Sequence, residues 1–231
     1  MRPEATLDCN FVSARIRVVE IEIPVEISIP ANAQGLVVFG DGVDSDSRNE
    51  AQHRLAEVLN EGGFGTVVGN LITAEDALFN PHSGELCSGL DLLERRLIAV
   101  TDWIAMQPRL ESLPLAYFGA GVGAEACLIA AARRPEVVRA VVACGAKLRH
   151  VEGYLKEICC PLLLIYGNDE ALSVDKQRLR TARLPDSTYR ELVLIGGALD
   201  PLEEEKAIEQ IVGMTRGWYS RFVVRRSTMS A

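Results

Sequence analysis

The sequence has 231 residues, 48% of them hydrophobic, enough to bury one sizeable core, so we expect a single domain over residues 1–231. Its formal net charge of −8 argues against nucleic acid or an anionic membrane as the main partner. No apolar run approaches the ~18 residues of a membrane span, and no basic segment followed by an apolar stretch opens the chain. We therefore expect a cytoplasmic protein without a membrane partner.

The first predicted elements are two strands with alternating apolar and polar residues, at 15–23 and 25–29, broken by Pro24. Such alternation is typical of half-exposed antiparallel strands. After Pro30 the pattern changes to short, continuous apolar runs, which predict strands buried on both faces, as in a parallel sheet covered by helices. These runs cover residues 36–39, 66–68, 115–118, 140–143, 162–166 and 192–195.

Amphipathic helical patterns separate these runs, at residues 48–61, 90–107, 122–134, 172–183 and 203–222. An antiparallel start followed by strand–helix alternation predicts a three-layer α/β domain with a mostly parallel sheet. In such folds ligands bind beyond the carboxyl ends of the strands. We therefore expect the functional site in the loops that follow Phe39, Phe118, Ala143, Tyr166 and Ile195.

The sharpest local motif is Gly119-Ala120-Gly121-Val122-Gly123, between an apolar run and an alanine-rich helical pattern. The nucleophile elbow G-x-S-x-G has this strand–turn–helix context, with flanking glycines that allow close packing of helix on strand. Gly121 stands where the elbow places its nucleophile. We expect positive φ or equivalent strain at this residue.

The chain resembles small α/β-hydrolases of the dienelactone-hydrolase-like kind over nearly its whole length. The resemblance implies the α/β-hydrolase fold. It also implies a triad acid at Asp169, a triad histidine position at Asp200, and oxyanion-hole donors near Gly42 and at the Val122 N–H. The stretches that carry it are LVVFGDG, TDWIAMQPRLESLPLAYFGAGVG, ARRPEVVRAVV, CCPLLLIYGNDE and ELVLIGGALDPLEE.

Three residues depart from the family pattern, and all three stand at positions that carry out the family's reaction. Asp41 replaces the histidine of a His-Gly pair, Gly121 replaces the nucleophile, and Asp200 replaces the catalytic histidine. Acyl transfer needs a hydroxyl or thiol and a base that takes its proton, so we expect no serine-hydrolase activity. Besides these positions, Val43 and Cys144 are candidate pocket residues.

Each of these positions also has a simpler interpretation. Glycine at 121 relieves the strain of positive φ, or leaves room for a ligand. Asp169 is equally consistent with a loop aspartate that accepts backbone N–H groups, and Asp200 with a helix N-cap. Cys144 as a replacement nucleophile lacks an identifiable base. The residues from Gly119 to Ala124 also match a dinucleotide-binding pattern, but neither their place in the chain nor the next strand, which ends without an acid, supports it.

The remaining ionisable and sulfur-containing residues predict no metal site and no cofactor. The acidic loop at 41–46 lacks the spacing of a calcium loop, so we interpret it as solvated or as a cap at Ser47. His82 and His150 are expected on the surface, and Glu125 carries no special signal. The six cysteines are expected to be reduced and structural, and Trp103 and Trp218 to pack helices on the sheet.

The sequence thus predicts a pseudoenzyme: an α/β-hydrolase fold retained for binding a small ligand or a protein partner, with homo-oligomerisation left open. The alternative is an unconventional enzyme or hydrolase that acts on a small ester or lactone-like substrate through Asp41, Asp169 or Asp200. A third hypothesis is an ordinary esterase whose nucleophile lies outside the elbow.

Overall fold

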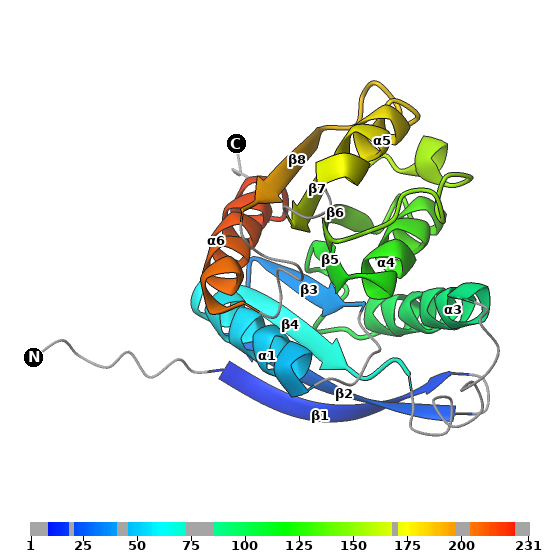
Figure 1. Ribbon diagram of the computed structural model, residues 1–231. Helices are drawn as coiled ribbons and strands as arrows, with labels where there is room; N and C mark the ends of the chain where they lie inside the picture. Colours follow the sequence, from blue (N-terminus) through cyan, green and yellow to red (C-terminus); the bar gives the residue numbers. More distant parts are fainter. Residues whose placement is uncertain are drawn as a thin grey trace, which may run out of the picture.

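The computed structural model describes residues 9–18, 21–40, 46–72, 86–167, 171–196 and 204–224. Within these ranges the chain forms an eight-stranded sheet with the strand order β1-β2-β4-β3-β5-β6-β7-β8 (Figure 1). The described helices cover both faces of this sheet, which gives the three-layer architecture that the sequence predicts.

The antiparallel part is the N-terminal hairpin, formed by β1 (Cys9–Val18) and β2 (Ile21–Pro30). The predicted break at Pro24 is wrong, because β2 runs through Pro24 and pairs it with Arg15. Proline is tolerated here because the antiparallel ladder between β2 and β4 begins only at Val25, so the missing N–H leaves no gap in that ladder.

The parallel part confirms the apolar runs, each of which lies in a strand. Every side chain of β3, β5 and β7 is buried. Two runs are less buried: Val68 of β4 is half-buried, and Leu194 of the edge strand β8 is 41% exposed. The strands are β3 (Gly35–Phe39), β4 (Phe64–Gly69), β5 (Leu115–Ala120), β6 (Val138–Cys144), β7 (Leu162–Gly167) and β8 (Arg190–Ile195).

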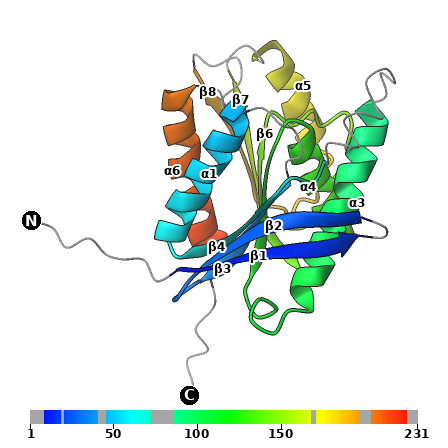
Figure 2. The ribbon, with the colours of Figure 1, turned by 90° about the horizontal axis from the view of Figure 1, so that it is seen from below.

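Figure 2 shows the two helical layers edge-on, with α1 and α6 on one side of the sheet and α3, α4 and α5 on the other. Each layer has its own apolar core, one containing Leu97 and Leu128 and the other Leu55 and Ile211. Both tryptophans pack in these cores as predicted. The helices are α1 (Asp46–Glu61), α3 (Leu86–Ala105), α4 (Val122–Arg133), α5 (Ala171–Thr181) and α6 (Glu205–Phe222), with a short 3-10 turn at Leu155–Glu157.

Two predicted helix caps are wrong. Helix α1 already includes Asp46, so Ser47 lies inside the helix and is not its cap. Helix α6 begins at Glu205 with Glu204 as its N-cap, so Asp200 is not the cap of that helix. In the described ranges, no helix combines the length and the apolar character that crossing a bilayer would require.

Candidate strand-end site

The elbow (residues 119–123) joins β5 to α4 through a turn of a single residue. Strand β5 ends at Ala120 and α4 begins at Val122, so Gly121 alone makes the turn. Its backbone has φ 54° and ψ −122°, a conformation that side-chain-bearing residues rarely adopt. The Gly121 N–H donates to the Cys144 carbonyl oxygen at 2.8 Å. The prediction of a strained strand-to-helix turn at Gly121 is confirmed.

Close backbone packing requires glycine at Gly119, before the turn, and at Gly40, after β3. A Cβ atom on Gly119 would lie 2.7 Å from the carbonyl carbon and oxygen of Gly123 and 2.8 Å from the Ala124 nitrogen. A Cβ on Gly40, the residue after β3, would collide with the Cys127 sulfur and lie 3.2 Å from the Gly123 oxygen. The end of β3 and the start of α4 therefore pack at a distance that only glycine permits.

The carboxyl ends of the parallel strands meet at the edge of the sheet that holds the elbow. Register pairs Phe39 with Phe118, Ala120 with Cys144 and Gly167 with Ile195. Three predicted site residues are described at this edge: Gly121, Val122 and Cys144. The other five lie outside the described residues, so their mutual contact stays a prediction: Asp41, Gly42, Val43, Asp169 and Asp200.

Val122 and Cys144 differ in what they can offer a ligand. Val122 is the first residue of α4, where a backbone N–H has no partner within the helix, and it is half-buried. This is the position from which a helix N-terminus can donate to a carbonyl or oxyanion. Cys144 is 2% exposed, and its carbonyl already holds the elbow. Its burial favours a structural role over that of a replacement nucleophile.

A buried carboxylate lies one helical turn after the elbow. Glu125 of α4 is 2% exposed, and its backbone N–H donates to the Gly121 oxygen. Its Oε1 accepts the Lys147 backbone N–H at 3.0 Å, and its Oε2 lies 2.7 Å from Nδ1 of His150. The Arg149 Nε–H donates to His150 Nε2 at 2.9 Å. Since Arg149 donates to Nε2, Nδ1 is the ring nitrogen that donates to the Glu125 carboxylate.

The expectation that His150 lies on the surface is wrong. The interpretation that Glu125 carries no special signal is also wrong. The His150 side chain is only 22% exposed and is held by the buried carboxylate. The contact spans 25 residues and joins a helix to a loop, so no local pattern reveals it. The one available signal is a carboxylate in the first turn of an otherwise alanine-rich helix, a place where burial demands a partner.

The loop that carries His150, residues 145–154 (the β6 loop), is fixed by polar contacts from two further elements, β7 and α5. Tyr166 of β7 donates its hydroxyl to the Ala146 oxygen at 2.8 Å. Gln177 of α5 accepts the Leu148 N–H at 3.2 Å, and Glu152 pairs with Arg180 of α5. The β6 loop is therefore a rigid wall at the edge of the sheet where the strands end.

Within the described residues no group of three or more histidine, cysteine or acidic side chains could hold a metal ion. The adjacent cysteines 159 and 160 differ in environment, since Cys159 is exposed and Cys160 is buried. Burial raises the pKa of the Cys160 thiol to about 12. A thiol with so high a pKa carries almost no thiolate at neutral pH and is a poor nucleophile.

Comparison with known proteins agrees with this geometry. The fold and the elbow define an α/β-hydrolase-fold protein. The chain has structural neighbours among dienelactone-hydrolase-like α/β-hydrolases. It is similar to the dienelactone hydrolase of Anabaena variabilis, with a TM-score of 0.84 and 29% identity over 93% of this chain and 99% of that one. A dienelactone hydrolase-like promiscuous phosphotriesterase from metagenomic libraries matches with a TM-score of 0.67 and 17% identity, over 93% and 99% of the two chains.

The curated relatives are longer proteins. A proposed phosphoribosyl transferase of Mycobacterium tuberculosis is 32% identical over 218 residues, which are 94% of this chain and 48% of that protein. The chain thus spans about half the length of the curated relatives it matches. No family model matches the chain.

Proposed function

We propose that this chain is a catalytically degenerate α/β-hydrolase-fold protein that binds a small ligand at the carboxyl edge of its sheet. The observation that carries the proposal is Gly121, which has the strained backbone of a nucleophile elbow and no side chain. Covalent acyl transfer through an elbow needs a hydroxyl or thiol at this residue. Glycine offers only its backbone and the space in front of it.

The sequence supports the same conclusion at the position of the base. Asp200 stands where the family places its histidine, and a carboxylate cannot act as an imidazole held in one tautomer by Asp169. Two carboxylates in contact would repel each other or recruit a cation. Loss of nucleophile and base together leaves at most a residual rate of roughly 10³-fold from binding and backbone donors.

The Glu125–His150 pair fits a binding wall better than a replacement base. Both ring nitrogens of His150 are occupied, Nδ1 by the carboxylate and Nε2 by Arg149. A general base needs a nitrogen lone pair within reach of the proton that it removes. The pair instead fixes the β6 loop beside the elbow, which supports a preformed pocket.

A second candidate is an enzyme that hydrolyses a small ester or lactone-like substrate through Asp41, Asp169 or Asp200. The names of two structural neighbours favour this class, since one is a dienelactone hydrolase and the other a phosphotriesterase. Phosphoribosyl transfer is supported less well. That name belongs to proteins of about twice this length, and a net charge of −8 disfavours a polyanionic donor.

Activity and binding can be tested on the same preparation. We expect no labelling by a fluorophosphonate probe and no burst with p-nitrophenyl acetate, while an active dienelactone hydrolase run in parallel gives both. Stoichiometric labelling at any serine would contradict the proposal and place the nucleophile outside the elbow.

For binding, we expect titration with a small lactone such as γ-butyrolactone to shift the backbone amide signals of Gly121, Val122 and Gly145 saturably. The lactone should remain intact throughout. If product accumulates above a heat-inactivated control, the enzyme hypothesis replaces the binding one. If no amide signal at this edge moves with the lactone or with any molecule that co-purifies, the small-ligand proposal is wrong.

A further inference from the structure

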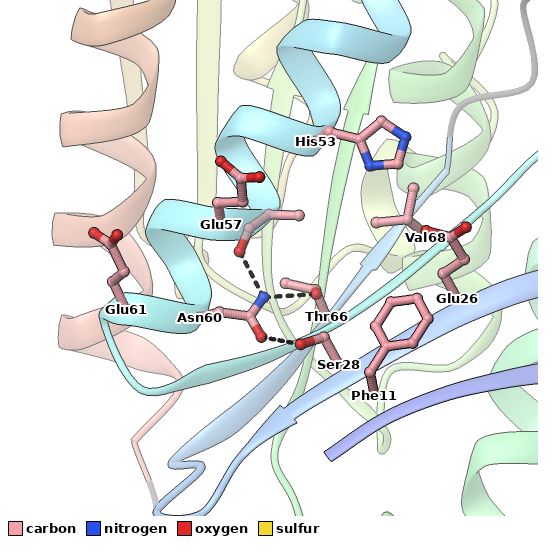
Figure 3. A pocket seen from close by; sticks show the side chains of 10 residues that line it. Phe11, Glu26, Ser28, His53, Glu57, Asn60, Glu61, Thr66 and Val68 are labelled. Carbon is pink, nitrogen blue, oxygen red and sulfur yellow. Dashed lines mark hydrogen bonds between the residues drawn. The ribbon is translucent and has the colours of Figure 1, made fainter. Parts of the chain in front are cut away.

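A hollow with a volume of about 390 Å³ lies away from the elbow, between α1 and one face of β1, β2 and β4 (Figure 3). None of its lining residues belongs to the elbow or the β6 loop. What it binds is therefore independent of the strand-end site.

Strand register explains which side chains form one side of this pocket. Phe11 lies opposite Ser28 and Ser28 opposite Thr66, while Glu26 lies opposite Val68. These five side chains therefore share one face of three neighbouring strands. Helix α1 inserts its apolar side into the core over β3 and β4 and leaves this face of the hairpin uncovered, which creates the hollow.

The floor of the pocket is polar and fully bonded. The Asn60 side chain is almost buried, and its amide nitrogen donates to the Ala56 oxygen at 2.6 Å and to Thr66 Oγ1 at 2.9 Å. Its oxygen accepts the Ser28 hydroxyl (Figure 3). Because these groups form hydrogen bonds with one another, the floor is rigid and needs no hydrogen bond from a ligand.

The walls are acidic and partly aromatic. Glu26, Glu57 and Glu61 line the pocket with exposed carboxylates, and the Phe11 ring is 62% exposed beside them. Among the described residues, no lysine or arginine lines it. Arg54, next to the lining residue His53 on α1, turns to α6 instead and pairs with Glu205 and Glu209. The three carboxylates therefore give the pocket a negative potential, and His53 is the other ionisable side chain in its described lining.

We propose that this pocket binds a small organic cation, an ammonium group on an aliphatic stem. The carboxylates attract the ammonium group, and the exposed face of Phe11 adds a cation–π contact. Ala56 and Val68 provide apolar surface for the methylene groups. The volume is at the lower end of that of small-molecule pockets, which suits a stem of a few carbons. Anions such as phosphate are excluded by charge.

The experiment is a titration with 1,5-diaminopentane at constant ionic strength, followed by the amide signals of the protein. Saturable shifts are expected at His53, Asn60 and Val68. Glu26→Gln and Glu57→Gln should each weaken binding about fivefold, the size of one partly exposed charge contact. Phe11→Leu should weaken it about threefold while keeping the apolar volume.

The controls separate a built site from general acidity. Glu111→Gln removes the same charge from an exposed residue elsewhere and should leave the affinity unchanged. The neutral analogue 1-pentanol should not bind, and thermal melts should show that each variant is folded. Non-saturable shifts spread over the acidic surface would overturn the proposal. So would wild-type affinity in both glutamine variants, or equal binding of 1-pentanol.

Discussion

The elbow and the β6 loop are neighbours at one edge of the sheet, since Gly121 donates a hydrogen bond to Cys144, the residue before the loop, yet they are built from opposite kinds of residue. The elbow depends on glycines, Gly119 for close packing and Gly121 for its positive φ, and both act through the backbone alone. The β6 loop is held by a buried carboxylate, an imidazole and two further polar side chains. The comparison teaches that the strand-to-helix turn depends on backbone conformation at Gly121, whereas the β6 loop depends on contacts between side chains.

The largest expected effect tests whether the elbow lacks only its reactive groups. Gly121→Ser combined with Asp200→His should give weak esterase activity, roughly 10²-fold above either single variant, because nucleophile and base act as a unit. Asp169, the flanking glycines and the Val122 N–H would complete the site. Hydrolysis of p-nitrophenyl acetate measures the rate.

That rate should stay well below the rate of a working relative. The family resemblance implies an oxyanion donor near Gly42, and Asp41 precedes that residue in the chain, so replacing its negative charge by adding Asp41→His should raise the rate further. If the double variant folds, brings the new serine and histidine within hydrogen-bond reach and still hydrolyses nothing, the pocket differs from a hydrolase in more than its reactive groups.

The next effect concerns the stability of the elbow itself. Gly119→Ala should lower the free energy of unfolding by about 3 kcal/mol, because its Cβ meets three backbone atoms that cannot turn aside. Urea denaturation measures this loss. Gly89→Ala, in α3 and with open space around the new Cβ, is the matched control and should be neutral or slightly stabilising. Equal stability of the two variants would mean that the elbow packs less tightly than described.

The elbow and the β6 loop also differ in how far the sequence predicts them. The order of strands and helices and the elbow follow from local patterns, because apolar periodicity and a GxGxG motif report on neighbours in the chain. The Glu125–His150 pair could not be predicted, because it depends on how α4 and the β6 loop pack. The continuation of β2 through Pro24 was missed for the same reason, since it depends on where the β4 ladder begins.

A smaller effect measures the pair directly. Glu125→Ala should cost about 2 kcal/mol, because it leaves the Lys147 N–H and the His150 ring without their acceptor. His150→Ala should cost less, and the double-mutant cycle should give a coupling energy of about 1 kcal/mol. Chemical denaturation of the four proteins supplies these values. Additive losses would show that the two side chains do not stabilise each other.

The smallest effect separates the two contacts of the imidazole. Arg149 is exposed and donates to His150 Nε2, so Arg149→Ala should change the free energy of unfolding by less than about 0.5 kcal/mol. The tautomer should not change either, because the buried Glu125 carboxylate still requires a proton on Nδ1. Nitrogen-15 spectra of the imidazole report this tautomer. The newly uncovered Nε2 should react faster with diethylpyrocarbonate than it does in the wild type. A switch of the proton to Nε2 would mean that Arg149, and not the carboxylate, orients the ring, and the β6 loop would then be held from its surface side.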